Sequence, residues 1–418
     1  MAANCDVICP SVDAGGKPAD EIRYLSRQPI LDVKGNVHAY ALLYGGAVGS
    51  VSGCEREARA LLDSAILLGL ERLTGGLPAF VRCTPAMLTA SLVEILPAGT
   101  TVLEIPCDLA LDPELIEACR RLKSEGFRLA LDNFAWQPGI DPLVEIASYI
   151  KIDFASTSVL DRAPLLERLG NAALARVAQN VESQDQYDLA RQERFTLMQG
   201  YHFCRPALLK NRQIPANRLS QVEILRLLQD ENLNLQKLTQ LVKRDASLTY
   251  RLLRFINSPA CAMKQEIYSV QTALLVVGED AFRRMASLAI TGELNAGQPP
   301  ELLRMAFVRG RFCELAAITY GLDCTEQYLL GLMSLVSAML RQPMKDLTPL
   351  LPLRGEIRLA LEGERVPERI LLAWIERYEL GDWPACDAIV AENRLDATVL
   401  RGCYEEAVQW AEAALHRE

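Results

Sequence analysis

The first half of the chain alternates short apolar runs with longer amphipathic stretches. Apolar runs of four to eight residues predict strands, and apolar residues spaced by three and four positions predict helices. The first two predicted strands flank the segment 32–36, Asp-Val-Lys-Gly-Asn, whose Gly and Asn suit a tight hairpin turn. The predicted strands are Ile22–Leu31, His38–Tyr44, Ala79–Thr84, Thr101–Pro106, Arg128–Asn133, Tyr149–Phe154, Ala175–Val181 and Thr196–Phe203.

This alternation predicts a closed barrel. Strands joined by helical crossovers close most economically into a (βα)8 barrel, here with a first strand that runs antiparallel to its neighbour. The carboxyl ends of the parallel strands then form one rim, where polar side chains of a functional site are expected. The predicted helices are Glu55–Leu73, Pro85–Leu96, Pro113–Glu125, Pro142–Ala147, Ala163–Leu169 and Gln184–Arg194.

The second half is predicted to be entirely helical. Strand patterns disappear after a polar, proline-containing linker at 206–221, and Leu248, Leu252 and Phe255 fall on one face of a helix. We therefore predict a flexible tail over residues 1–20, a barrel over 21–210 and a helical domain over 211–418. The predicted fold class is α/β plus all-α. Trp374, Trp383 and Trp410 fit a core better than a contact surface.

Composition narrows the functional classes. The net charge of −9 over 418 residues gives no field that would attract nucleic acid. The twelve cysteines are scattered, many of them in apolar runs, which favours a reduced, cytoplasmic protein. Cys5 and Cys9 lack nearby Cys or His partners and fit an untethered tail better than a metal site. The start has no signal-peptide pattern, and the apolar run Tyr328–Leu340 is too short to span a membrane.

A family resemblance rests on two of the predicted strand ends. The segments 132–135 (Asp-Asn-Phe-Ala) and 151–153 (Lys-Ile-Asp) resemble the Asp-Asp-Phe-Gly and Lys-Ile-Asp motifs of EAL-type cyclic di-GMP phosphodiesterases. The resemblance implies a barrel that holds two divalent cations among carboxylates and an Asn. In active members, the cations activate a water that attacks the phosphodiester, and an Arg clamps phosphate.

Several positions depart from the family pattern. Ala41 replaces a metal ligand, Gly45 the phosphate-binding Arg, and Arg82 the ligand Asn. A second-site carboxylate becomes Cys107, and the partner of Asp132 becomes Asn133. Gln179 stands at the position of the implied general base, and Gln does not accept a proton at neutral pH. These changes predict a barrel with no catalytic residue, no bound metal and no cofactor.

Other positions match the family, and the resemblance implies that they form what remains of its nucleotide-binding pocket. Without cations, we expect Lys151 to neutralise Asp132 in an ion-pair network at the rim; metal-free nucleotide binding is the alternative. The retained residues are Glu104, Asp132, Lys151, Asp153, Glu182 and Gln199.

The helical half carries a second resemblance. Residues 244–249 (Arg-Asp-Ala-Ser-Leu-Thr), 269–273 (Ser-Val-Gln-Thr-Ala) and 277–278 (Val-Gly) resemble the HDOD domain, a helical relative of HD-type hydrolases. Those hydrolases need an adjacent His and Asp as metal ligands, and the matching positions here are Ser334 and Leu335. With only three histidines in the chain, none of them in this domain's core, a His-based metal centre is excluded.

Together these observations predict an EAL–HDOD signalling adaptor without catalytic activity. It would act in a cyclic di-GMP-related pathway through contacts with unidentified signalling proteins, made by the HDOD half. One alternative is a metal-independent cyclic di-GMP receptor that switches domain arrangement. The other alternative is a residual phosphodiesterase, for which alone Mg²⁺ or Mn²⁺ would be expected; hydrolysis of another nucleotide is a further variant of that alternative.

Overall fold

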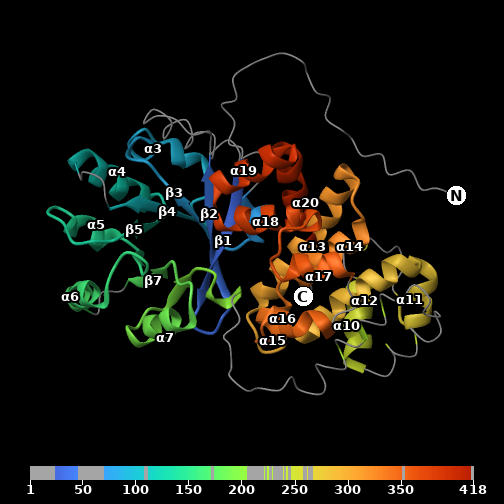
Figure 1. The fold of residues 1–418 in the computed structure, drawn as a ribbon. Helices are drawn as coiled ribbons and strands as arrows, with labels where there is room; N and C mark the ends of the chain where they lie inside the picture. Colours follow the sequence, from blue (N-terminus) through green and yellow to red (C-terminus); the bar gives the residue numbers. More distant parts are fainter. Residues whose placement is uncertain are drawn as a thin grey trace, which may run out of the picture.

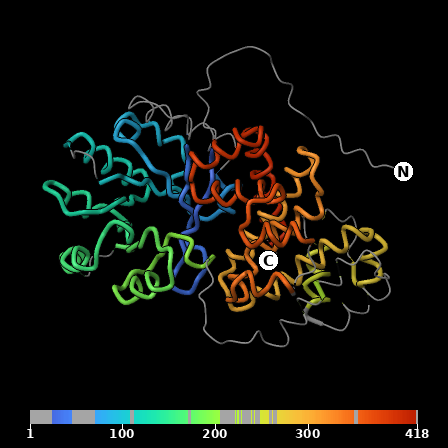
Figure 2. The backbone as a smooth tube through the Cα atoms, viewed as in Figure 1, coloured from blue at the N-terminus to red at the C-terminus, as the bar shows by residue number. Residues whose placement is uncertain are grey.

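The computed structural model describes residues 24–45, 70–107, 112–170, 174–204, 246–257, 267–350 and 354–415, with single positions between 221 and 261. Two halves lie side by side, a barrel formed by the earlier residues and a helical half formed by the later ones (Figures 1 and 2). The predicted tail, the predicted linker, most of the predicted helix Glu55–Leu73 and both Cys5 and Cys9 lie outside the described residues. The predicted boundary between 210 and 211 therefore stays a prediction.

The strands of the first half close into a barrel in the order β1-β2-β3-β4-β5-β6-β7-β8. β1 is antiparallel to both β2 and β8, and each later neighbouring pair is parallel. This confirms the predicted (βα)8-type barrel with a reversed first strand. The strands are Tyr24–Asp32 (β1), Val37–Gly45 (β2), Ala79–Arg82 (β3), Thr101–Pro106 (β4), Arg128–Asp132 (β5), Tyr149–Asp153 (β6), Ala175–Gln179 (β7) and Leu197–Gln199 (β8).

Local chemistry explains where these elements begin and end. In the β1–β2 turn, Asp32 Oδ1 accepts hydrogen bonds from the backbone N–H groups of Lys34 and Asn36 at 2.8 and 2.9 Å, and Gly35 adopts φ +84°. Side-chain caps start several of the crossover helices, as at Ser183, which accepts from the N–H of Gln186. The helices described here are Leu70–Thr74 (α2), Pro85–Thr89 (α3), Pro113–Ser124 (α4), Asp141–Ile146 (α5), Val159–Leu169 (α6) and Gln184–Gln192 (α7), with a short 3-10 helix at Leu92–Ile95.

The strands predicted at Ala79–Thr84 and Ala175–Val181 end two residues early, at Arg82 and Gln179, and the last predicted strand is too long by a wider margin. The run Thr196–Phe203 forms strand only over Leu197–Gln199, and His202–Cys204 forms a 3-10 helix (η2). The chain turns at Gly200, where φ is +148° and a Cβ would overlap the backbone of Val181. The apolar pattern continues through this turn because Tyr201 and Phe203 pack into the core of the other half.

The second half is helical wherever it is described, as predicted. Its central helix is α13 (Pro300–Tyr320), which packs along α14 (Cys324–Met333) and α20 (Ala397–Leu415). The predicted run Tyr328–Leu340 is divided between α14 and α15, and no described helix combines the length and apolar composition needed to cross a bilayer. The other helices are Ala246–Ile256 (α10), Val270–Val277 (α11), Glu279–Leu294 (α12), Val336–Leu340 (α15), Met344–Leu347 (α16), Gly355–Leu361 (α17), Ile370–Leu380 (α18) and Trp383–Asn393 (α19), with 3-10 turns at Thr348–Leu350 and Pro367–Arg369.

The two halves meet at β1 and β2. In Figure 1 these two blue strands stand at the boundary, next to α18 and α19. The Tyr378 hydroxyl donates to the backbone oxygen of Leu25 at 2.7 Å, and Arg27 donates to Glu412 at 2.9 Å. Tyr40 on β2 donates to Glu301 on α13 at 2.8 Å. The outward faces of both strands are therefore buried by the helical half through these polar contacts and through apolar packing of Tyr24 and Leu31.

Candidate functional site

A polar layer crosses the barrel on top of an apolar layer. The apolar layer consists of inward-facing residues, among them Phe80, Val102, Ala130, Tyr149 and Val177. Since side chains alternate between the two faces of a strand, residues two positions later face the same interior, nearer the carboxyl ends. Those next positions are Arg82, Glu104, Asp132, Lys151, Gln179 and, on β8, Gln199.

The centre of this layer is a buried cation held by two carboxylates. The ammonium group of Lys151, whose side chain is 1% exposed, forms an ion pair with Glu104 and lies 3.4 Å from Asp132 Oδ1. Burial alone would favour the neutral amine, but the two carboxylates outweigh it and hold the pKa of Lys151 above its ordinary value. Lys151 therefore carries a fixed positive charge here.

Two further groups occupy the oxygens of Asp132. The side-chain amide of Gln179 donates a hydrogen bond to Oδ1 over 2.8 Å. The guanidinium of Arg82, 51% exposed on its side chain, approaches Oδ2 to 4.0 Å. Asp132 is thus surrounded by two cations and an amide donor, and Gln179 acts as a donor where the family resemblance implies a base.

The end of β2 is covered by the helical half. Ala41 is buried in the apolar layer and offers no ligand atom. At Gly45, a Cβ would overlap the indole ring of Trp383, the first residue of α19. Trp383 also stacks on Tyr24 of β1, with ring centroids 5.3 Å apart. The space beside the strand where the family carries a phosphate-binding Arg is therefore filled by a tryptophan from the other half.

The remaining predicted pocket residues lie outside the Lys151 cluster. Gln199 donates to Gln28 of β1 at 2.7 Å. Asp153 accepts from the N–H of Ala155 at 2.7 Å and from the Asn180 amide at 3.0 Å, so it orders its own loop. The backbone N–H of Glu182 donates to the Gln186 side chain in the loop before α7.

Two of the positions that depart from the family pattern, Cys107 and Asn133, also lie outside the Lys151 cluster. Cys107 packs into the outer apolar cluster, between the barrel and its helices. Asn133 is exposed, with φ +50°, a conformation that Asn tolerates better than most residues.

The donor set does not fit a pair of divalent cations. Such ions require several oxygen ligands from carboxylates, amides or carbonyls. The two carboxylates present already neutralise Lys151, and the neighbouring positions supply a methyl group at Ala41 and a guanidinium at Arg82. Across the described residues, no group of three or more His, Cys, Asp or Glu side chains is arranged to hold a metal ion.

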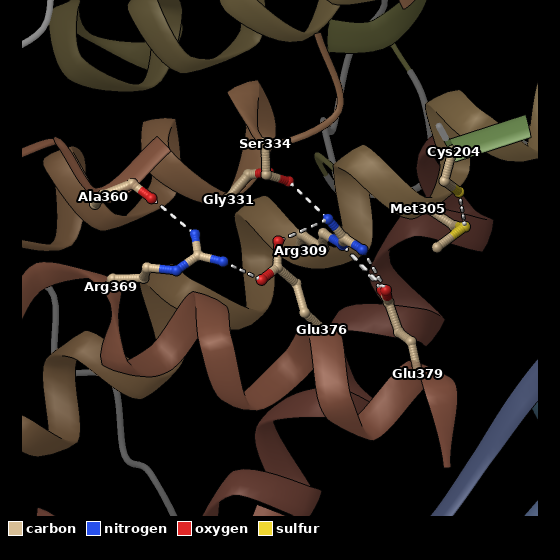
Figure 3. A network of polar contacts seen from close by, with 9 residues as sticks. All are labelled: Cys204, Met305, Arg309, Gly331, Ser334, Ala360, Arg369, Glu376 and Glu379. Carbon is tan, nitrogen blue, oxygen red and sulfur yellow. Dashed lines mark hydrogen bonds and ion pairs between the residues drawn. The ribbon is translucent and has the colours of Figure 1, made fainter. Parts of the chain in front are cut away.

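The helical half shows a parallel arrangement at Ser334, the position matched to the hydrolase histidine. Figure 3 shows the guanidinium of Arg309 between Ser334 and two glutamates of α18. Arg309 donates to Glu379 at 2.7 Å and to the Ser334 hydroxyl at 3.1 Å, and it lies 3.6 Å from Glu376. A buried Arg–Glu cluster therefore occupies this region of the helical core.

Some of these contacts could not have been found by motif matching. Ser26, Arg27 and Gln28 are polar residues between apolar residues of β1, which is a signal for buried partners but does not name them. Arg309 lies far from every motif, and nothing in the local sequence links Trp383 to Gly45. The functional roles assigned to the rim residues stay predictions.

Known proteins resemble this chain in both of its halves. The HDOD domain model matches residues 214–341. The Bacillus subtilis (strain 168) protein YuxH, described as uncharacterized, is 31% identical over 400 residues, which is 93% of this chain and 97% of that protein. The cyclic di-GMP phosphodiesterase CdgJ of Vibrio cholerae is 29% identical over 399 residues, covering 93% of this chain and 92% of CdgJ.

A solved structure with a similar region is the PaMucR phosphodiesterase in complex with c-di-GMP. It covers 47% of this chain and 93% of its own, with 18% identity and a TM-score of 0.36. The similarity to YuxH extends over both halves of the chain, and the HDOD match lies in the second of them. The chain therefore belongs to the EAL–HDOD family of two-domain bacterial signalling proteins.

Proposed function

We propose that this protein is an EAL–HDOD signalling adaptor that does not hydrolyse cyclic di-GMP and acts through protein–protein contacts. The observation that carries the proposal is the guanidinium of Arg82, which lies 4.0 Å from Asp132 Oδ2 at the position where the family resemblance implies an Asn ligand to a metal ion. Arg82 thus places a cation of the protein where the resemblance implies an oxygen ligand, and the carboxylates of Glu104 and Asp132 are already paired with Lys151. The proposal accordingly includes no metal and no cofactor.

The chemistry of hydrolysis supports the same conclusion. A metal-bound water becomes a nucleophile near neutral pH because the ion lowers its pKa. Here the carboxylates that would bind the ion are paired with Lys151, and Gln179 cannot accept the proton of an attacking water. Loss of a general base alone lowers the rate by about 10²–10⁴-fold.

The helical half supplies surface for a protein partner. Apolar side chains are exposed on α11 and on α10, which packs against it; Leu275 is 85% exposed and Tyr250 is 63% exposed. Exposed apolar groups of this kind often mark contact surfaces. A partner bound at this surface would leave the interface with the barrel intact. We also infer a cytoplasmic location, which the cysteines buried in apolar surroundings, such as Cys83, Cys119 and Cys313, support.

A hydrolysis assay tests the absence of activity. Purified full-length protein, incubated with cyclic di-GMP and Mg²⁺ or Mn²⁺, is expected to release no linear product, while CdgJ serves as the positive control. Turnover that disappears in both Asp132→Asn and Glu104→Gln would refute the proposal and establish a residual phosphodiesterase. The same substitutions would identify a hydrolase of another nucleotide in a substrate panel.

The adaptor role needs a separate test. The full-length protein and its Leu275→Ser variant serve as baits in the native host, with Leu160→Ser, an exposed apolar residue of the barrel, as the matched control. We expect a partner that is lost with Leu275→Ser and retained with Leu160→Ser. The opposite pattern would place the contact on the barrel.

A second candidate is a metal-independent cyclic di-GMP receptor that changes domain arrangement. It is favoured by one observation: Trp383 of the helical half lies against the end of β2, so a ligand entering there would have to move α19. Titration calorimetry with and without Mg²⁺ separates the candidates. Micromolar binding accompanied by a change in the small-angle scattering curve would favour the receptor.

A further inference from the structure

A cavity of about 480 Å³ lies between the two halves, away from the polar layer of the barrel. The barrel contributes the β1–β2 turn, α7 and η2, and the helical half contributes the α12–α13 connection and the end of α15. The turn reaches the other wall at Gly35, where a Cβ would lie 3.4 Å from Pro299. Cavities of this size between domains are common positions for small-molecule sites.

The cavity carries one cation from each half. Lys34 of the turn makes no side-chain hydrogen bond or ion pair within the described part of the chain. Arg341 has only Gln298 as a partner there, at 3.4 Å, and no carboxylate. The one carboxylate in the lining, Asp32, is held by the turn: burial acts to raise its pKa, but the hydrogen bonds from Asn36 and Lys34 prevail and lower it. Asp32 is therefore ionised and offsets one of the two cations, and the lining, with Lys34 and Arg341 against Asp32, keeps a net charge of +1 that favours an anion.

A pair of stacked rings forms another part of the wall. The rings of Tyr187 and His202 lie 4.6 Å apart with an interplanar angle of 20°. The Tyr187 hydroxyl donates to the backbone oxygen of Val33 at 3.2 Å, which joins α7 to the turn. Among the described residues, the buried Nδ1 of His202 has no hydrogen-bond partner. Both rings belong to the cavity lining, so the ring pair forms an aromatic part of its wall.

We propose that this interdomain cavity binds a nucleoside monophosphate, with its phosphate between Lys34 and Arg341 and its base beside the Tyr187–His202 pair. Arg and Lys are the usual phosphate partners, and aromatic side chains are sequence-tolerant platforms for bases. Because the two cations belong to different halves, the ligand joins them and opposes their separation. The site shares no residue with the Lys151 cluster and does not depend on the proposed lack of phosphodiesterase activity.

Titration calorimetry on the full-length protein tests the site with adenosine and guanosine 5′-monophosphate, with inorganic phosphate and the two nucleosides as further probes. Binding of a nucleotide with a dissociation constant below about 100 µM is expected, with weaker binding of phosphate and of the nucleosides. Lys34→Glu and Arg341→Glu should each weaken nucleotide binding by about tenfold or more. Arg120→Glu, an exposed arginine on α4, is the matched control and should bind as the wild type does.

Three results would overturn the assignment. The first is no binding of either nucleotide at about 1 mM. The second is binding of inorganic phosphate as tight as that of the nucleotides, which would leave no role for the ring pair. The third is nucleotide binding that survives both charge reversals but is lost in Arg82→Glu, which would place the ligand at the carboxyl end of the barrel.

Discussion

The ammonium nitrogen of Lys151 lies 3.4 Å from Asp132 Oδ1 while it also contacts Glu104. The helical half has a comparable relationship, in which Arg309 pairs with Glu379 beside Ser334. In each half, a cation belonging to the protein pairs with buried carboxylates. Removing either cation should therefore lower folding stability.

The first prediction concerns Lys151. Lys151→Met leaves Glu104 and Asp132 buried without their shared cation, and we expect the free energy of unfolding to fall by about 3–5 kcal/mol. Urea denaturation followed by circular dichroism measures the change. The double variant Lys151→Met/Glu104→Met should recover part of the loss, because it removes one of the unpaired charges. Lys345→Met, at an exposed lysine, is the matched control, and an equally small effect of Lys151→Met would contradict the ion-pair account.

The second prediction concerns the contact between Gly45 and Trp383. Gly45→Ala introduces a Cβ that overlaps the indole ring, and we expect a loss of about 1–3 kcal/mol in the free energy of unfolding, with faster proteolysis between the two halves. Gly99→Ala is the matched control, because a Cβ there meets no atom within 4 Å. Trp383→Ala in the Gly45→Ala background should relieve the overlap. A Gly45→Ala protein as stable and as protease-resistant as the wild type would show that this contact does not hold the halves together.

The third prediction concerns Arg309. Arg309→Met removes the partner of Glu379 inside the helical core, and the expected loss in the free energy of unfolding is about 3–5 kcal/mol. Arg377→Met is a suitable control, since Arg377 is 52% exposed and pairs with Asp382 at 3.3 Å on the surface. Exposed pairs contribute about 0–1 kcal/mol. Equal losses in the free energy of unfolding for the two substitutions would show that the buried cluster stabilises the fold no more than an exposed ion pair does.

The barrel could be predicted from the chain because its strands follow a simple rule. Each strand ends soon after an apolar run, as Arg128–Asp132 and Tyr149–Asp153 do, and the two-residue period places Asp132 and Lys151 on the inner face. The convergence of Glu104, Asp132 and Lys151 follows from neighbouring parallel strands. The resemblance to the family motifs then predicts which ligand positions are replaced, and those assignments stay predictions.

The interface between the two halves could not be predicted, because it depends on contacts between residues far apart in the chain. The overlap that would exclude a side chain at Gly45 comes from Trp383, and the partner of Arg27 is Glu412. No local pattern encodes such pairs, since they arise only when the helical half docks on β1 and β2. The length of the last strand was overestimated for a similar reason: Tyr201 and Phe203 are apolar because they pack into the helical half, not because they extend the strand.

The fourth prediction concerns the pH dependence of stability at His202. Burial lowers the pKa of His202 to about 4, against a small opposing effect of Asp188, whereas an unfolded chain has a histidine pKa near 6.5. As the pH falls below 6.5, the unfolded state binds a proton before the folded state does, so the stability that His202 contributes above pH 6.5 is lost progressively toward pH 4. Between pH 7.5 and pH 4.5 this loss amounts to about 2–3 kcal/mol. The variant His202→Gln cannot titrate at this position. Urea denaturation at both pH values gives the unfolding free energy of the variant and of the wild type. The difference between the two proteins should shift by that amount in favour of the variant at pH 4.5. The carboxylates titrate in both proteins, so their contributions to the free energy largely cancel in the comparison. A difference that does not change with pH would contradict the prediction, because it would show that His202 is protonated in the folded state as readily as in the unfolded chain.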